Sequence, residues 1–251
     1  MPDSSSLPPT PVSWAYADAW AEEDPAIAAA RRRSEGLGAP TIDRATGAAL
    51  RVLTAALGAS AVVEIGTGTG VSGAWIVGGL ADHGSLTTVD SDPDLNAAAR
   101  ETFAQLGAAH TRVRAIAADP LDVLPRLADG AYDLMVIGPG VWVDADPTAT
   151  QVAKRGGSAD PTATQVAGTE DHELLAQALR LLRPGGALAI CHALSEDGHR
   201  HDGHRDLSHH LRDDPRWIPA LLTVGDGLLV AVRHPIGGET RVADPTASAE
   251  G

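Results

Sequence analysis

Apolar residues recur along the chain with two alternating periods, and this alternation predicts the fold. Short apolar runs bounded by turn residues predict strands, whereas apolar positions three and four residues apart predict helices. Strands are expected at residues 61–65, 85–90, 111–119, 132–138 and 187–193, with two more inside 217–234. Helices are expected at residues 12–33, 41–57, 72–81, 93–107, 120–128 and 170–186.

Strands that alternate with helices along a chain form a mostly parallel sheet covered on both faces. The last two strands flank Gly225-Asp226-Gly227, a hairpin turn signal that adds an antiparallel edge. We therefore expect an α/β fold: a Rossmann-like, seven-stranded, mostly parallel sheet with helices on both faces and an antiparallel C-terminal hairpin. Ligands bind such sheets beyond the carboxyl ends of the strands, so motifs at strand ends carry the functional prediction.

A chain of 251 residues can form one large domain, which we expect over residues 12–236. Residues 1–11 and 237–251 are expected to be flexible tails. Within residues 138–169 the sequence ADPTATQVA occurs twice, and it is too short to be a solenoid unit. We expect an irregular loop there, with an extended substrate lid as the alternative.

The net charge of −14 argues against nucleic acid or an anionic membrane surface as a partner. The basic residues Arg31 to Arg33 fall in a helical pattern, where we expect a solvated helix face. No window of about 18 uncharged apolar residues is present, and the N-terminal residues lack the features of a secretory signal. Cys191 is the single cysteine, which prevents an internal disulfide and favours a cytoplasmic location.

The sequence AVVEIGTGTG at residues 61–70 carries the clearest functional signal. Glycines at 66, 68 and 70 let the backbone turn tightly and approach a ligand without an intervening side chain. A helix follows directly, and its N-terminal amides can donate hydrogen bonds to a carboxylate or another anionic group. Glu64, at the end of the strand, can accept hydrogen bonds from loop amides or from a ligand ammonium group.

Two classes of ligand use such a loop. The dinucleotide pattern G-x-G-x-x-G is present at Gly68, Gly70 and Gly73, but it begins three residues after Ile65 instead of directly after the strand. A nicotinamide cofactor is therefore the weaker alternative. Asp90 ends the next strand and fits either class, because a carboxylate there can accept hydrogen bonds from two ribose hydroxyls.

The pattern E-x-G-x-G-x-G at residues 64–70 resembles motif I of class I S-adenosylmethionine-dependent methyltransferases. The segments VVEIGTGTGVSGAWI, LTTVDSDPDLNAAARETFAQLG, ALRLLRPGGALAI and DPRWIPALLTVGDGLLVAVR follow in the order expected of the catechol O-methyltransferase-like bacterial family. The chain is similar to that family over roughly residues 39–137 and 172–234.

This resemblance implies an O-methyltransferase that moves a methyl group from S-adenosylmethionine to a hydroxyl of a small-molecule acceptor, and it suggests a homodimer. The alternative is a catalytically impaired S-adenosylmethionine-binding protein with a sensor or structural role. In methyltransferases an acid at the position of Asp119 commonly pairs with the adenine amino group. The implied cofactor-binding residues are Glu64, Gly66, Thr67, Gly68, Gly70, Ser72, Asp90 and Asp119.

Members of this family hold a divalent metal with an Asp that ends the fourth strand and an Asp-Asn pair that ends the fifth. Here Gly138 and the pair Cys191-His192 stand at those positions, so we expect the metal site to be lost. Asp144 or Asp146 could fold back as a substitute. A set of Asp144, Cys191 and His192 would suit Zn²⁺ better than Mg²⁺.

His192 has a possible role without a metal. At the end of the fifth strand its neutral imidazole could take a proton from the acceptor hydroxyl, and it is our candidate catalytic residue. Cys191 is expected to be a small buried residue and not a nucleophile. The histidine-rich segment 195–210 can bind metal ions, but its spacing matches no defined site, so we expect a solvated loop near the substrate.

Overall fold

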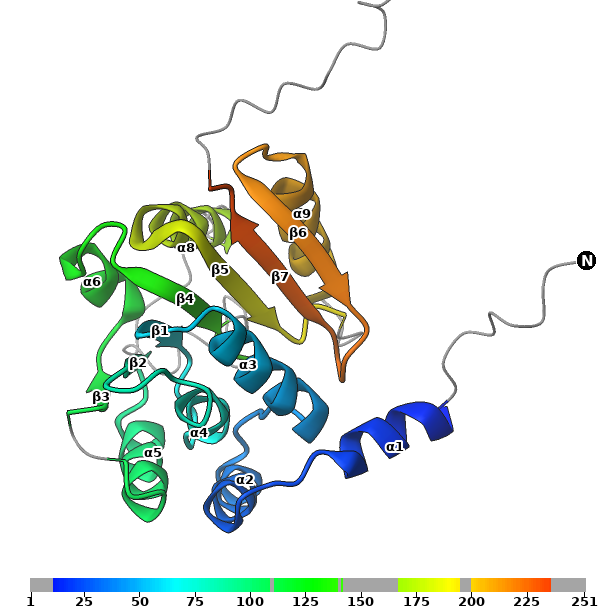
Figure 1. The fold of residues 1–251 in the computed structure, drawn as a ribbon, viewed down its shortest axis with the longest axis vertical. Coiled ribbons are helices and arrows are strands. Elements are labelled where there is room, and N and C mark those ends of the chain that lie inside the picture. The colour runs from blue at the N-terminus through cyan, green and yellow to red at the C-terminus, as the bar shows by residue number, and fades with distance from the viewer. Residues whose placement is uncertain (1–10, 109–110, 140, 142–166, 195–199, 236–251) are drawn as a thin grey trace, which may run out of the picture.

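The computed structural model describes residues 11–108, 111–139, 141, 167–194 and 200–235 of the chain. Its centre is one sheet of seven strands (Figure 1). The strands are β1 (Ala61–Ile65), β2 (Ser85–Asp90), β3 (Val113–Ala117), β4 (Tyr132–Ile137), β5 (Leu182–Cys191), β6 (Trp217–Leu222) and β7 (Leu228–Arg233).

The strand order is β3-β2-β1-β4-β5-β7-β6. Strands β1 to β5 pair in parallel, whereas β7 runs antiparallel to both of its neighbours. The predicted α/β class with its C-terminal antiparallel hairpin is confirmed. The chain runs outward from β1 to β3 and then returns to place β4 on the other side of β1, so the topological switch point lies between β1 and β4.

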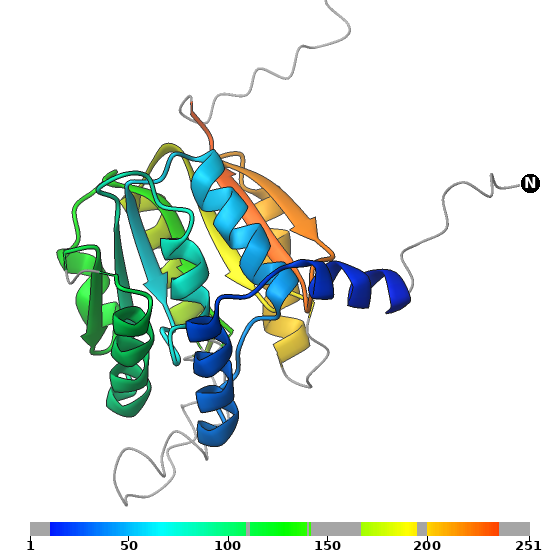
Figure 2. The same cartoon turned by 60° about the horizontal axis from the view of Figure 1, so that its bottom comes forward.

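Helices cover both faces of the sheet, as Figure 2 shows. Helices α2, α3, α4 and α5 lie on one face, and α8 and α9 lie on the other. The helices are α1 (Pro11–Trp20), α2 (Pro25–Leu37), α3 (Arg44–Ala56), α4 (Val71–Val77), α5 (Pro93–Gln105), α6 (Pro120–Val123), the 3-10 helix η1 (Leu124–Arg126), α8 (Ala167–Leu181) and α9 (Arg200–Asp213).

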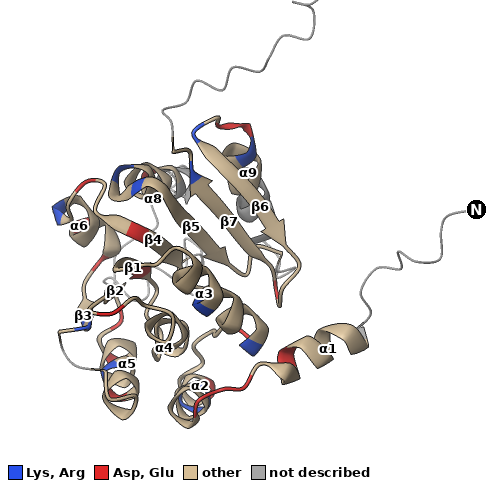
Figure 3. Ribbon diagram, in the orientation of Figure 1, with Lys and Arg blue, Asp and Glu red and all other residues tan. Residues whose placement is uncertain are grey.

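Alternation along each central strand divides the core into two layers. In β4, Leu134 and Val136 pack with the α2–α5 layer, whereas Met135 and Ile137 pack with the α8–α9 layer. Successive side chains of a strand point to opposite faces, so a strand covered on both faces is mostly apolar. Figure 3 accordingly shows charged residues mainly on helices and connecting segments.

The helix expected at residues 12–33 is in fact two helices, α1 and α2. The chain breaks between them because Asp24 accepts a hydrogen bond from the Ala26 amide, 2.8 Å away, and so caps a new helix. Pro25 at the first helical position removes an amide that would have had no partner. The sequence contained this cap-and-proline signal, but the apolar periodicity on either side concealed it.

The helix expected at residues 170–186 ends earlier, at Leu181, and β5 begins at Leu182 instead of residue 187. Pro184 and Gly185 therefore lie in the first part of the strand, where the pairing with β4 shifts register between Tyr132 and Leu134. Such an irregularity tolerates a residue without an amide and a glycine with positive φ.

The histidine-rich segment 195–210 is not simply a loop, because residues 200–213 form α9. Leu207 and Leu211, four residues apart, are buried in the α8–α9 layer with Trp217. This pair places one face of the helix on the sheet. The metal-binding alternative rests on side chains outside the described residues.

Asp133 of β4 forms hydrogen bonds with residues at the start of β1 and with Arg183 of β5. We expect Asp133→Ala to lower the free energy of unfolding by about 2–4 kcal/mol. Its carboxylate accepts hydrogen bonds from the amides of Ser60 (2.7 Å) and Ala61 (2.9 Å) and from Arg183 Nε (2.6 Å). Burial alone would raise the pKa of Asp133, but these hydrogen bonds outweigh it and lower the pKa. The Asp133 contribution is therefore present above about pH 4 and lost as the pH falls through its folded pKa.

Chemical denaturation at pH 7 and at pH 3 checks this expectation. Asp129→Ala is the matched control, because Asp129 is exposed and pairs only at the surface with Arg180. The control is expected to cost less than about 1 kcal/mol. Equal losses in the two variants would contradict the account.

Candidate functional site

A cavity of about 720 Å³ opens where the strands end at the switch point. Its floor is the glycine loop, through residues 65–69, 71 and 72, and one end is formed by the segment after β2 together with Asp119. Residues 37–42 form a further wall, and Pro139, Val141 and Leu174 lie toward β4. The volume is in the range of small-molecule and cofactor sites, and its position is where open α/β sheets bind ligands.

The three loop glycines have different reasons to be glycine, although all three have positive φ. At Gly66 a Cβ would lie 2.6 Å from a methyl carbon of Val141, so the backbone passes too close for a side chain. At Gly70 a Cβ would meet Ala99 of α5 at 3.2 Å. At Gly68 a Cβ would meet no atom within 4 Å, so this position faces open space at the cavity.

Asp90 connects β2 to the glycine loop. One carboxylate oxygen accepts a hydrogen bond from the Gly68 amide at 2.8 Å, and the other accepts one from the Asp92 amide at 2.9 Å. Partial burial raises the pKa of Asp90, and these backbone hydrogen bonds oppose the rise. The carboxylate lines the cavity with acceptor capacity left over, since each oxygen has two lone pairs. It can therefore accept hydrogen bonds from a diol.

Asp119 lies in the same end of the cavity, two residues after the end of β3. Its carboxylate caps α6 by accepting a hydrogen bond from the Leu121 amide at 2.9 Å. The side chain is exposed, so its second oxygen is open to a ligand donor. The cavity thus brings together six of the eight predicted cofactor residues: Gly66, Thr67, Gly68, Ser72, Asp90 and Asp119.

Glu64 and Gly70 do not line the cavity. Glu64 is fully buried beneath α4, where its Oε2 accepts a hydrogen bond from Thr88 at 2.7 Å and a second comes from Ser72. Among the described residues its Oε1 has no partner. Thr88 also bonds to Thr67 at 2.6 Å, so the carboxyl group connects to the cavity wall through Thr67 and Ser72.

We expect the pH dependence of stability to reveal Glu64. Burial raises the pKa of Glu64 to about 7, although the hydrogen bonds with Ser72 and Thr88 lower the pKa by a smaller amount. The folded protein therefore holds one more proton than the unfolded chain between about pH 4.5 and 7, and stability falls as the pH rises through this window. The fall contributed by Glu64 is on the order of 3 kcal/mol.

Denaturation curves between pH 4.5 and 8 check this prediction. Glu64→Gln removes the titrating group and keeps the volume, so its stability should depend less steeply on pH than that of the wild type. Glu101→Gln, a change at an exposed position of α5, should leave the slope as it is. A wild-type slope in the Glu64 variant would show that this carboxyl group titrates normally.

The carboxyl end of β5 carries Cys191 and His192. Cys191 is fully buried, and burial raises the pKa of its thiol, so it is a core residue and not a nucleophile. His192 adopts a left-handed backbone conformation with φ 58°, and its Nε2 lies 3.8 Å from the Asp226 carboxylate. His192 is not part of the cavity lining. It follows β5, which pairs with β4, and Pro139 and Val141, which follow β4, do line the cavity.

Comparison with known proteins places the chain in a family. A family model described as a methyltransferase domain matches residues 63–192, which include β1, the glycine loop, Asp90 and Asp119. A Mycobacteroides abscessus protein, named as a candidate O-methyltransferase, is 36% identical over 242 residues, covering 93% of this chain and 100% of the relative. The chain belongs to the methyltransferase-domain family.

Solved structures agree with this assignment. A Corynebacterium glutamicum protein is 27% identical with a TM-score of 0.68 and covers 87% of this chain and 94% of its own. The cofactor-bound Rv0187 of Mycobacterium tuberculosis is 26% identical, also with a TM-score of 0.68, over 92% of this chain and 100% of its own. The resemblance to methyltransferases noted in the sequence is confirmed.

The metal site that the sequence resemblance implies does not fit the described part of this methyltransferase domain. At Gly138, where an aspartate would be required, a Cβ would lie 2.7 Å from the Gly66 carbonyl oxygen. Cys191 is buried in the core, and no group of three or more metal-ligating side chains occurs among the described residues. The substitutes Asp144 and Asp146 lie outside those residues.

Sequence reasoning missed the cavity wall formed by residues 37–42 of the methyltransferase. It also assigned Arg31 to Arg33 to a solvated helix face, which is wrong for Arg31 and Arg33. Arg31 is partly buried in an ion pair with Glu23, and Arg33 donates a hydrogen bond to Thr102 of α5 at 2.7 Å. The unbroken helix expected at 12–33 concealed the turn that carries Glu23.

Proposed function

We propose that the protein transfers a methyl group from S-adenosylmethionine to a hydroxyl group of a small molecule. The observation that carries the proposal is the placement of Asp90 and Asp119 with the open position at Gly68 in one cavity at the switch point. Family membership agrees with it, since the relatives are named as O-methyltransferases.

The residues present suit this cofactor. Asp90 can accept hydrogen bonds from the ribose hydroxyls, and Asp119 can accept one from the adenine amino group. The glycine loop and Ser72, at the start of α4, offer donors and acceptors to the amino-acid portion. When bound there, S-adenosylmethionine supplies an electrophilic methyl group, and the enzyme's task is to hold the acceptor oxygen in line with it.

In this proposal His192 is the general base that takes the proton lost by the acceptor hydroxyl. If Asp90 and Asp119 hold the ribose and adenine, the reacting end lies toward Pro139 and Val141, and the acceptor must reach from there to His192, which follows the neighbouring strand β5 and is not among the lining residues. Asp226, 3.8 Å from Nε2, can stabilise the imidazolium that results. With His192 as the base, the proposed proton transfer does not require a bound metal ion.

The finer expectations on assembly and location are part of this proposal. We propose a cytoplasmic homodimer that binds no nucleic acid. Within the described residues, no helix combines the length and apolar character needed to cross a bilayer. Helix α1 exposes Trp14, Tyr16 and Trp20, large apolar side chains that a second copy could cover. Light scattering at several concentrations measures the assembly state.

Transfer of labelled methyl from S-adenosylmethionine to a panel of phenols, catechols and other small hydroxyl compounds, with amines and thiols included for comparison, tests the proposed function. The expected result is a labelled methyl ether with at least one acceptor, formed also after EDTA treatment. Tight cofactor binding with no transfer across the panel would favour the alternative of a sensor or structural role. Transfer to nitrogen or sulfur acceptors alone would contradict the assignment.

A further inference from the structure

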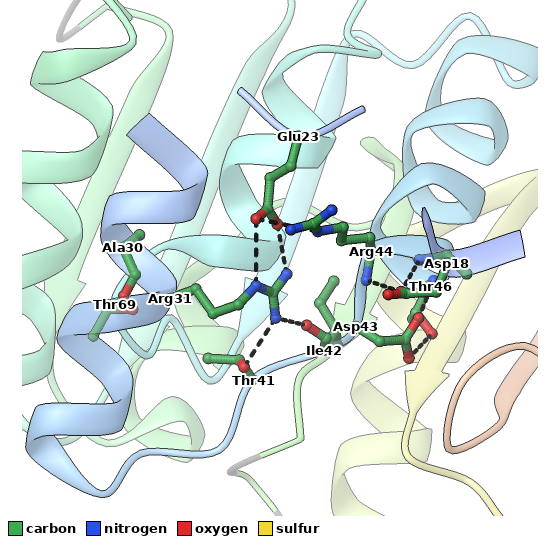
Figure 4. Close-up of polar contacts among 11 residues, drawn as sticks. Asp18, Glu23, Ala30, Arg31, Thr41, Ile42, Asp43, Arg44, Thr46 and Thr69 are labelled. Carbon is green, nitrogen blue, oxygen red and sulfur yellow. Dashed lines mark hydrogen bonds and ion pairs between the residues drawn. The ribbon is translucent and has the colours of Figure 1, made fainter. Parts of the chain in front are cut away.

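Arg31 connects three segments of the chain through polar contacts, as Figure 4 shows. Its guanidinium bonds to both carboxylate oxygens of Glu23, the shorter contact being 2.6 Å. On the other side it donates to the Thr41 hydroxyl at 3.2 Å and to the Ile42 carbonyl oxygen. Thr41 and Ile42 belong to the cavity wall of residues 37–42. The guanidinium therefore holds that wall from outside the cavity.

The same helix, α2, is also fastened to the floor of the cavity. Thr69 of the glycine loop donates from its hydroxyl to the Ala30 carbonyl at 2.9 Å and bonds to the Ser34 hydroxyl at 2.7 Å. Thr69 and Ser34 are both buried. Helix α2 thus lies between the two parts of the cavity. It is hydrogen-bonded to the glycine loop through Thr69 and, through Arg31, to the wall of residues 37–42.

The carboxylate that pairs with Arg31 is buried and has further contacts. The Glu23 side chain is 3% exposed, and Arg44 lies 3.7 Å away on its other side. Asp18 accepts hydrogen bonds from the amides of Arg44 (2.8 Å) and Ala45 (3.2 Å), which fixes the start of α3 directly after the wall. A buried carboxylate of this kind favours the position in which Arg31 pairs with it, because moving Arg31 away removes the shorter of its two ion pairs.

We propose that Arg31 is a positioning residue of the cofactor cavity: it holds the wall of residues 37–42 at a fixed distance from the glycine loop. The identity of the ligand in this inference rests on the proposed function. The positioning role itself rests on the hydrogen bonds of Arg31. Arg31 itself is not among the residues that line the cavity. It acts through Thr41 and Ile42, whose placement sets the width of the cavity.

Arg31→Met tests the proposal with two measurements: calorimetric titration of S-adenosylmethionine, and hydrogen exchange of the ligand-free protein over residues 38–43. We expect binding about tenfold weaker, because small misplacements of a binding wall carry large costs. We also expect faster exchange in that segment alone. Arg31→Lys should fall short of the wild type in both, since one ammonium cannot reach Glu23 and Ile42 together as the planar guanidinium does.

Arg183→Met is the matched control. Arg183 also pairs with a carboxylate, Asp133, but at the opposite end of the strands. It should lower stability while leaving both the binding constant and the exchange of residues 38–43 unchanged. If Arg31→Met does not fold, Arg31→Lys carries the same comparison.

Wild-type binding and wild-type exchange in the Arg31 variants would overturn the proposal. An equal weakening of binding in Arg183→Met would overturn it too, because the effect would then be general destabilisation. If the unaltered protein does not bind S-adenosylmethionine, the proposed function fails, and the exchange measurement still decides whether Arg31 holds the wall.

Discussion

Replacing Asp90 with alanine is expected to weaken S-adenosylmethionine binding by about 100-fold, or about 2.7 kcal/mol. In the proposed site the change removes a charged acceptor for two ribose hydroxyls, each hydrogen bond being worth about 1.5 kcal/mol or more. It also frees the Gly68 amide, which the carboxylate holds at 2.8 Å. Loop placement and ligand contact are therefore lost together, and titration calorimetry measures the sum.

Asp122→Ala is the control for this change. Asp122 is an exposed residue of α6 outside the cavity lining, and its removal alters the net charge by the same amount. We expect it to bind like the wild type. Asp90→Asn keeps one neutral acceptor and should give an intermediate affinity. An Asp90→Ala protein that is folded and binds normally would remove Asp90 from the site.

Replacing His192 with asparagine is expected to lower kcat by at least about 100-fold without changing cofactor affinity, because the variant lacks the proposed general base. Asparagine is the informative substitution. It tolerates the left-handed backbone conformation that His192 adopts, so the effect is not confused with backbone strain. Single-turnover measurements with an acceptor identified from the panel separate the chemical step from binding.

His83→Asn is the control for this variant. His83 is the other described non-glycine residue with positive φ, at 62°, and it lies at the amino end of β2, away from the cavity. Its replacement should leave turnover unchanged. A His192→Asn protein with wild-type kcat would show that the proton leaves by another route, and the role proposed for Asp226 would fall with it.

Much of the fold could be predicted because the central strands are covered on both faces. Val63 in β1 and Met135 in β4 pack under one helix layer, whereas Val62 and Leu134 beside them pack under the other, so each strand is mostly apolar, with Glu64 and Asp133 as the acidic exceptions. A run of this kind, followed by Gly66 and the glycines after it, is a local signal. The floor of the cavity is built from one continuous segment, and the sequence predicts it for that reason.

The features that the sequence did not predict depend on residues brought together by folding. Arg31 and Ile42 are separated by a helix end and a turn, and no periodicity indicates that they meet. In α9, the spacing of Leu207 and Leu211 is a helical signal, but polar and histidine residues around it favoured a loop. Gly138 illustrates the same limit: only the folded backbone shows that its neighbour Gly66 leaves no room for an aspartate side chain.

The most direct test of the account is one calorimetric titration of S-adenosylmethionine into the EDTA-treated wild-type protein. We predict saturable binding of one molecule per chain, with a dissociation constant in the micromolar range, in the cavity that Asp90 and Asp119 line. No measurable heat or saturation at millimolar cofactor would contradict the central claim, because the glycine loop and both carboxylates would then serve some other ligand.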